Sequence, residues 1–215
     1  MRAKTGSIVA MVLMSLVLSG GLTGCTVASL VGANSEPAPV THDLLASGRK
    51  GLGHLPIQMI VAEPSAVQAL SNSRIAIKPG PQEISFFAAA VWSDKLPRLL
   101  QLRLVETFET SRILKAVGTG SERIRGDIGL SWEIRDFQVE VNKGAARAHA
   151  RFYVKLIDED KGIVVASKEF SATAQARDDS VAAGVEALKE AFGAASIKIM
   201  RWITSRRIVV ADARD

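Results

Sequence analysis

Cys25 is the only cysteine in this 215-residue chain, and its thiol is a group that can form a covalent bond as a nucleophile. Before it lie two basic residues, Arg2 and Lys4, and an apolar run over residues 8–18. A basic start, an apolar stretch and small residues after it are typical of a secretory signal peptide. The apolar run is shorter than the roughly 20 residues that a membrane-spanning helix needs. The sequence therefore predicts that residues 1–24 are a signal peptide.

The three residues in front of Cys25 are apolar or small: Leu22, Thr23 and Gly24. Together with Cys25 they resemble the lipobox of bacterial lipoproteins. The resemblance implies a diacylglycerol on Sγ of Cys25, cleavage after Gly24, and an N-acyl chain on the new amino group. Several acyl chains anchor a protein stably, whereas a single chain binds a membrane only marginally. An ordinary signal peptide followed by an unpaired cysteine is the alternative.

The position after the cysteine bears on which membrane would hold the anchor. Thr26 stands there, rather than an aspartate. By resemblance to enterobacterial sorting rules, this favours the outer membrane, with the protein facing the periplasm. Lipidation of Cys25 would leave the periplasmic part with no thiol and no disulfide, although an oxidising compartment permits disulfides.

The length and composition predict one folded domain after the signal peptide. Residues 25–41 are small and polar, with prolines at positions 37 and 39, and we interpret them as a lipidated tether. The folded domain is expected over residues 42–207, followed by a tail over residues 208–215. The net charge of +5 is mild and scattered, so it does not indicate a nucleic-acid partner.

Alternating and helical patterns predict the elements of the first half of this domain. We expect strands over residues 56–62, 74–78, 84–92 and 113–117, with a helix before the last of them. Ser93 or Asp94 would cap that helix, and Pro97 suits its first turn. The apolar residues at helical spacing run to Phe108.

The second half is predicted to be three long strands and a helix. Strands over residues 126–141, 146–156 and 163–174 would form an antiparallel meander with one face in water. The apolar alternation changes phase at Arg135 and Asp136, which predicts a β-bulge there. Asp178 or Asp179 would cap the final helix, whose apolar residues recur up to position 202. The fold class is α/β (α+β), a single domain with a mainly antiparallel sheet and two main helices on one face.

The residue types offer no convincing catalytic or metal site. The histidines are isolated, and His149 falls on the polar face of a strand, where surface pairing is expected. The acidic residues 158–160 are expected to form a solvated hairpin turn. A small sheet should bury only some of the three tryptophans, so an exposed one, with Trp92 as the candidate, could contact a partner.

Several segments of the domain resemble one known family. They are residues 73–75, 92–97, 99–100, 108–111 and 116–117, and then residues 164–172 and 181–202. With the lipobox, they resemble the ABC-type transport auxiliary lipoprotein family over residues 42–205. Its members include the outer-membrane lipoprotein partner of paraquat-inducible protein B and the auxiliary lipoproteins of MCE-type lipid transporters. The sequence departs from the family at Val91, where an arginine is expected.

This resemblance implies a protein that is not an enzyme and needs no cofactor. Its partners would be a periplasmic MCE-domain protein with its ABC permease and ATPase, and a homo-oligomer is also compatible with the wet sheet face. The transported molecule would be phospholipid or another hydrophobic lipid. Two alternatives stay open: an outer-membrane assembly or lipid-binding lipoprotein that is not coupled to an ABC transporter, and an enzyme with a dispersed site.

Overall fold

The structure is a computed structural model that describes residues 38–122, 125–142 and 145–206. The predicted signal peptide, Cys25 and the predicted tail beyond residue 207 lie outside these ranges. The strands are β1 (Val40–His42), β2 (Leu55–Val61), β3 (Ser65–Ala66), β4 (Arg74–Lys78), β5 (Ser85–Trp92), β6 (Leu114–Thr119), β7 (Ile128–Asn142), β8 (Ala145–Asp158) and β9 (Ile163–Gln175). The helices are α2 (Leu96–Ser111) and α3 (Val181–Thr204), with short 3-10 turns η2 (Gln68–Leu70) and η3 (Gly120–Glu122).

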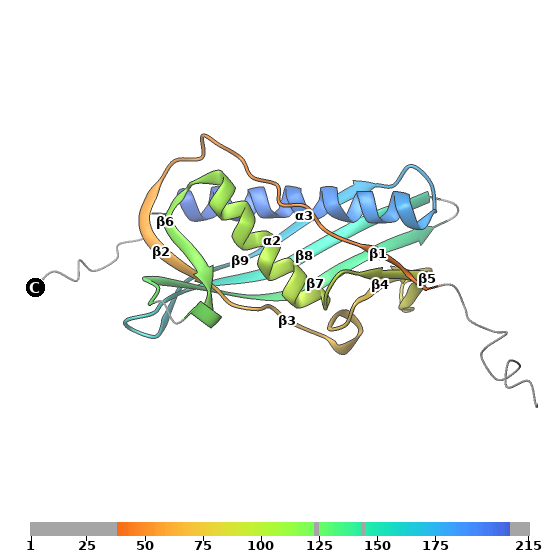
Figure 1. Ribbon diagram of the computed structural model, residues 1–215, viewed down its shortest axis with the longest axis horizontal. Helices are drawn as coiled ribbons and strands as arrows, with labels where there is room; N and C mark the ends of the chain where they lie inside the picture. The colour runs from red at the N-terminus through yellow and green to blue at the C-terminus, as the bar shows by residue number, and fades with distance from the viewer. Residues whose placement is uncertain (1–37, 123–124, 143–144, 207–215) are drawn as a thin grey trace, which may run out of the picture. The chain divides into compact units, whose positions relative to one another are not determined.

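The strands β7, β8 and β9 form the predicted antiparallel meander (Figure 1). Their inward residues are almost all buried and apolar, and polar residues alternate with them on the other face. The register between β7 and β8 shifts between Ile134 and Asp136, so Arg135 and Asp136 together stand opposite Arg151. This confirms the β-bulge that the phase change predicts.

The opposite edge of β7 pairs with three different strands in turn. β2, β3 and β4 all run parallel to β7, and each occupies its own part of this long strand. β5 continues the sheet antiparallel to β4, while β1 and β6 lie parallel to β5 and β2. The prediction of a single α/β domain with two main helices is confirmed, and the parallel pairs make its sheet mixed. β1 also includes the last two residues of the segment predicted to be a tether.

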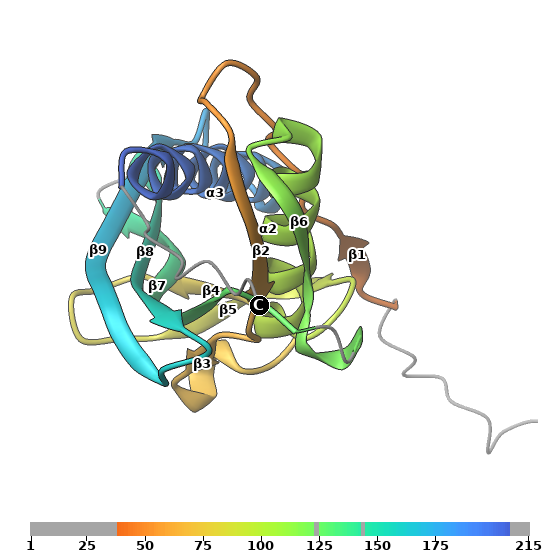
Figure 2. The same ribbon diagram turned by 90° about the vertical axis from the view of Figure 1, so that its left-hand side faces the viewer.

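Helix α3 lies in the hollow of the curled sheet, and Figure 2 shows it nearly end-on above β7 and β8. Its Phe192 meets Phe137 and Phe152 edge-on, with ring centroids 6.4 and 6.2 Å apart. Apolar residues along the same side of α3 are also buried, which is the reason for the 3-4 spacing in the sequence. The prediction that Asp178 or Asp179 caps this helix is wrong by one or two positions. Ser180 is the N-cap, and its Oγ accepts a hydrogen bond from the backbone N–H of Ala183.

Helix α2 packs against β6 and β2 and begins without the predicted side-chain cap. Lys95 is the N-cap, and Pro97 lies in the first turn as expected. The prediction of Ser93 or Asp94 as the cap is wrong. Ser93 instead donates to Asp43, and Asp94 accepts from the adjacent backbone N–H of Lys95. The helix begins later than predicted, at Leu96, so Ser93 and Asp94 precede the N-cap position.

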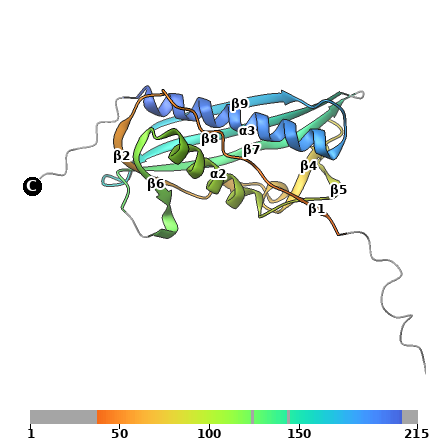
Figure 3. The ribbon, with the colours of Figure 1, turned by 45° about the horizontal axis from the view of Figure 1, so that its top comes forward.

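The segment over residues 43–54 runs from β1 along the helices to β2, as Figures 1 and 3 show. Leu44 is fully buried, and Ser47 donates its backbone N–H to Oγ1 of Thr107 on α2 at 3.2 Å. On α3, an added Cβ at Gly193 would lie 2.4 Å from Oγ of Ser47, so the helix needs glycine where this segment passes. The segment thus fastens both helices to the sheet.

Candidate functional site

The polar face of β7, β8 and β9 carries a connected group of charged side chains. Both helices lie on the other side of these strands (Figure 2). We call it the outer face. Its polar members are Glu133, Arg135, Asp136, Gln138 and Glu140 on β7, Arg147, His149, Arg151, Tyr153 and Lys155 on β8, and Ser167, Glu169, Ser171, Thr173 and Gln175 on β9.

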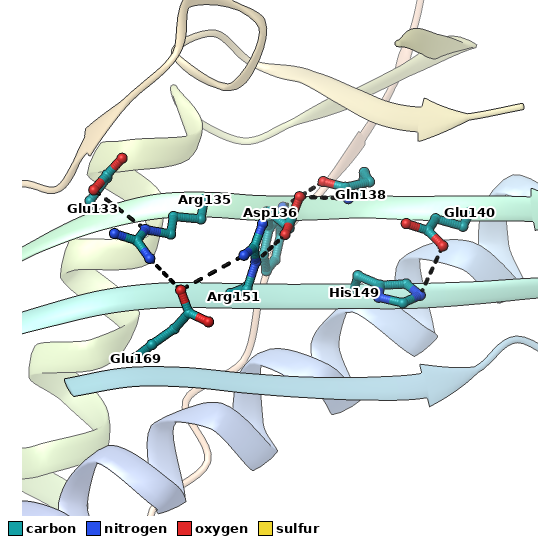
Figure 4. Close-up of polar contacts among 9 residues, drawn as sticks. Glu133, Arg135, Asp136, Gln138, Glu140, His149, Arg151 and Glu169 are labelled. Atoms are coloured by element: carbon teal, nitrogen blue, oxygen red, sulfur yellow. Dashed lines mark hydrogen bonds and ion pairs between the residues drawn. The ribbon is translucent and has the colours of Figure 1, made fainter. Parts of the chain in front are cut away.

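The β-bulge organises the ion pairs at the centre of the outer face (Figure 4). The bulge puts two consecutive residues, Arg135 and Asp136, on the outer face. Arg135 therefore pairs with Glu169 on β9, while Asp136 accepts a hydrogen bond from Nε of Arg151. Arg135 also lies 3.6 Å from Glu133, and Arg151 lies 3.7 Å from Glu169. These five side chains therefore form one connected network across three strands.

The two arginines of this network are partly exposed, with 35% of the Arg135 side chain and 43% of the Arg151 side chain accessible. The hydrogen bond to Glu169 raises the pKa of the Arg135 guanidinium; desolvation opposes the rise, and the charges of Glu133 and Glu169 add to it. Arg135 also lies over the ring of Tyr153, 4.5 Å from its centroid. Exposed ion pairs contribute little stability, typically below about 1 kcal/mol each. The network therefore shapes the charge pattern of this face more than it stabilises the fold.

The side chains of Gln138 and His149 extend the ordered face towards the far end of β7. Gln138 is 4% exposed, accepts the backbone N–H of Phe137 at 2.8 Å and donates to Asp136 at 3.1 Å. His149 Nε2 lies 3.2 Å from a carboxylate oxygen of Glu140. The surface-pairing role expected for His149 is confirmed.

The structure corrects the expectation for the tryptophans. Trp92, Trp132 and Trp202 are 2%, 3% and 6% exposed, so all three are buried. They find room because the sheet curls: Trp92 packs near Phe137, and Trp202 packs on Phe170 at the edge strand β9. Trp92 is therefore a core residue and is not on the surface that a partner could contact.

The other predicted site residues are placed as follows. Leu22, Thr23, Gly24 and Cys25 lie outside the described residues, so the lipobox stays a prediction. Asp158 lies at the start of the β8–β9 turn and accepts the backbone N–H groups of Asp160 and Lys161 at 3.1 and 3.0 Å. The side chain of Lys161 also donates to Asp158, at 2.9 Å. This hydrogen bond and those from the backbone lower the pKa of the Asp158 carboxyl. The hairpin turn that the sequence predicts is present, but Asp158 is only 8% exposed, so only Glu159 and Asp160 are solvated as expected.

The chemistry available on the described chain is recognition by paired charges. Within residues 38–122, 125–142 and 145–206, no group of three His, Cys, Asp or Glu side chains is placed to hold a metal ion. No helix in those ranges is long and apolar enough to cross a membrane. Sequence reasoning missed the network of the outer face, although its signal was present. Polar residues, most of them charged, recur at every second position of β7 and β8, and the phase change brings Arg135 and Asp136 to the same face.

Comparison with known protein families and sequences identifies the family of this chain. The model of the ABC-type transport auxiliary lipoprotein component matches residues 45–200. An uncharacterised protein of Bradyrhizobium diazoefficiens is 27% identical over 187 residues, which are 86% of this chain and 50% of that protein. The chain thus spans about half the length of this curated relative.

Solved structures share the fold. A Xanthomonas campestris protein of the DUF330 family has a TM-score of 0.70 and 24% identity, over 77% of this chain and 94% of that one. The crystal structure of an uncharacterised protein has a TM-score of 0.59 and 15% identity, over 77% and 99% of the two chains. Because the family model covers well over half of the chain, the protein belongs to the ABC-type transport auxiliary lipoprotein component family.

Proposed function

We propose that this protein is a non-enzymatic, lipid-anchored accessory component of an MCE-type ABC transporter that moves phospholipid or another hydrophobic lipid across the cell envelope. The observation that carries the proposal is the family match over residues 45–200. The lipobox sequence at residues 22–25 supports the anchor, and Thr26 supports its retention at the outer membrane, facing the periplasm.

The anchor would act by concentrating the domain near the transporter. Acyl chains on Cys25 hold one end of the chain at a membrane. The tether of roughly 15 residues that follows can reach about 50 Å when it is extended. Confining the domain to a membrane surface raises its effective concentration for a partner that reaches that membrane, without any new contact. A domain attached in this way can meet the end of a periplasmic assembly while it stays at its own membrane.

The outer face is the surface that we assign to the periplasmic partner. Its central charges are already paired with one another, so they keep a fixed pattern that a complementary surface can recognise. The partner would be the MCE-domain protein, which is held in turn by its permease and ATPase. A second copy of this chain could use the same face, which would make a homo-oligomer.

Affinity purification of a C-terminally tagged full-length protein from native membranes tests this proposal. Mass spectrometry should find an MCE-domain protein together with its permease or ATPase. A variant with Arg135→Ala and Glu169→Ala, which breaks the outer-face network, should recover much less of them. A matched control, Lys189→Ala with Glu186→Ala, removes the ion pair on α3 and should recover as much as the wild type. Recovery of only outer-membrane assembly factors would overturn the transport proposal.

The lipid anchor has its own test. Cys25→Ala removes the sulfur that would carry the diacylglycerol, so the protein should leave the membrane fraction while its folded domain stays intact. Fractionation after a high-salt wash, followed by immunoblotting, measures this. If the Cys25→Ala protein remains with the membranes after the wash, the anchor is not an acylated Cys25.

A further inference from the structure

A groove lies between the edge strand β9 and the C-terminal end of α3, and Glu169 of the outer-face network stands at its margin. We call it the α3–β9 groove. It is lined by Lys168, Glu169, Phe170 and Ser171 of β9 and by Lys198, Arg201, Trp202 and Ser205 of α3. Arg206 lies beside it, with its guanidinium 5.4 Å from the centroid of the Trp202 ring.

The groove gathers cations that lack carboxylate partners. Lys168, Lys198, Arg201 and Arg206 are all exposed, and none forms an ion pair with a carboxylate of the described residues. Lys198 donates to the backbone oxygen of Ser171 at 2.6 Å, which holds its ammonium over β9. The one acidic residue of the lining, Glu169, is neutralised by Arg135 and Arg151 on the outer face. The groove is therefore positive.

The floor of the groove is aromatic, and its neighbourhood on β9 is apolar. Phe170 and Trp202 pack edge-to-face with centroids 5.3 Å apart, and Lys168 lies over the Phe170 ring. The Trp202 indole N–H is buried and has no hydrogen-bond partner among the described residues. A few residues before Lys168 on the same strand, Ile163, Val164 and Val165 are 52%, 54% and 45% exposed. Cations, aromatic rings and exposed aliphatic side chains thus lie along one edge.

We propose that the α3–β9 groove binds the phosphate group of an anionic lipid, with the lipid's apolar part against the exposed aliphatic residues of β9. The four cations match a phosphodiester in charge, and arginine and lysine are the residues that bind phosphate in proteins. Exposed aliphatic side chains next to cations suit a molecule that is charged at one end and apolar at the other. The lipid's role as cargo rests on the proposed transport function, but the binding itself does not.

The groove lies at the end of the folded domain that is opposite β1. The chain enters the domain at β1, and α3 starts near that end of the sheet (Figure 1). The C-terminal end of α3 and the β8–β9 turn lie at the opposite end of the same helix and strands (Figure 1). A lipid in the groove would therefore be held at the end of the domain remote from β1.

Binding can be measured on the full-length protein purified in detergent, by the change in tryptophan fluorescence during titration with short-chain phosphatidylglycerol below its micelle-forming concentration. The wild type should give a saturable change. Phosphatidylcholine of the same chain length, whose headgroup carries no net charge, should bind more weakly. Inorganic phosphate is the third ligand. If inorganic phosphate competes for the groove as well as phosphatidylglycerol does, the groove recognises free phosphate. If only the lipid binds tightly, the phosphate that the groove recognises belongs to a lipid headgroup.

Two variants of equal charge separate the groove from general electrostatics. Lys168→Gln with Arg201→Gln should weaken binding by about tenfold, because it removes two of the four cations at the groove. Lys155→Gln with Lys189→Gln removes two cations elsewhere, on the outer face and on α3, and should bind like the wild type. Circular dichroism confirms that both variants are folded.

The outcomes decide the two proposals separately. Equal binding by the wild type and the groove variant, equal weakening in both double variants, or no saturable change for the wild type would each overturn the groove as a phosphate site. Lipid binding that is lost only in the groove variant supports it. If that loss is found while no ABC transporter is recovered in the affinity purification, the groove stands and the transport function fails.

Discussion

Arg151 and Phe152 are neighbours on β8, yet their side chains lie on opposite faces of the same strand. Phe152 is fully buried and its ring lies 5.3 to 6.3 Å from those of Trp132, Phe137 and Phe192. Arg151 is 43% exposed and pairs with Asp136 and Glu169. The two faces of the meander thus use different interactions, since apolar burial on the inner face excludes water and the ion pairs on the outer face remain hydrated.

This difference separates what holds the domain together from what it can present to a partner. Burial of apolar area is the dominant favourable contribution to folding, and rings in contact add to it. Partly exposed ion pairs add little. The outer face can therefore carry a specific charge pattern at small cost in free energy of unfolding, which leaves it available for recognition.

The largest expected effect comes from the inner face. Phe152→Ala should lower the free energy of unfolding by about 3–5 kcal/mol, because it removes a ring from the centre of the core and leaves a cavity. Urea unfolding followed by circular dichroism measures it. Phe152→Leu, which keeps most of the volume, is the matched control and should cost less. A loss below about 1 kcal/mol for Phe152→Ala would mean that the inner face does not dominate stability.

The adjacent residue provides the direct contrast. Arg151→Ala should lower the free energy of unfolding by less than about 1 kcal/mol, because Asp136 and Glu169 remain hydrated and Glu169 keeps Arg135 as a partner. The same unfolding measurement checks it, and Arg151→Lys serves as a control that keeps the charge. A loss as large as that of Phe152→Ala would show that the outer-face network is structural.

A smaller effect, visible with pH, is expected at the segment that fastens the helices. Burial tends to raise the pKa of Asp43, but hydrogen bonds from Arg103, Leu44 and Ser93 outweigh it and the pKa lies below its ordinary value of 3.8. A carboxyl with a lowered pKa stabilises the fold above its unfolded-state pKa, and this contribution is lost as the pH falls through the folded-state pKa.

Asp43→Asn should therefore be less stable than the wild type at pH 7, by less than about 1 kcal/mol because the pair with Arg103 is half-exposed. The difference should shrink as the pH falls below 3.8. Urea unfolding of both proteins at neutral and acid pH measures it. A difference that stays constant with pH would mean that the ionised carboxylate is not what stabilises this segment.

The local elements were predictable because their signals are local. Apolar alternation identified β7, β8 and β9 and placed the bulge at Arg135 and Asp136, and the 3-4 spacing identified α3. The helix caps were mispredicted because both helices begin one or two residues later than expected, with Lys95 and Ser180 at their N-cap positions. Burial of all three tryptophans could not be foreseen, since it depends on how strongly the sheet curls.

The sequence by itself determined the lipobox prediction at Cys25, the order of the longer strands and helices without β1 and β3, and the resemblance that the family match confirms. Only the tertiary structure decided the parallel pairing of β2, β3 and β4 with β7, the network of the outer face and the α3–β9 groove. The physical reason is range. The spacing of apolar residues and the capping of helices depend on residues that are close together in the sequence. The groove instead depends on the packing of β9 against α3, which brings Lys168 and Arg201 together although they are distant in the chain.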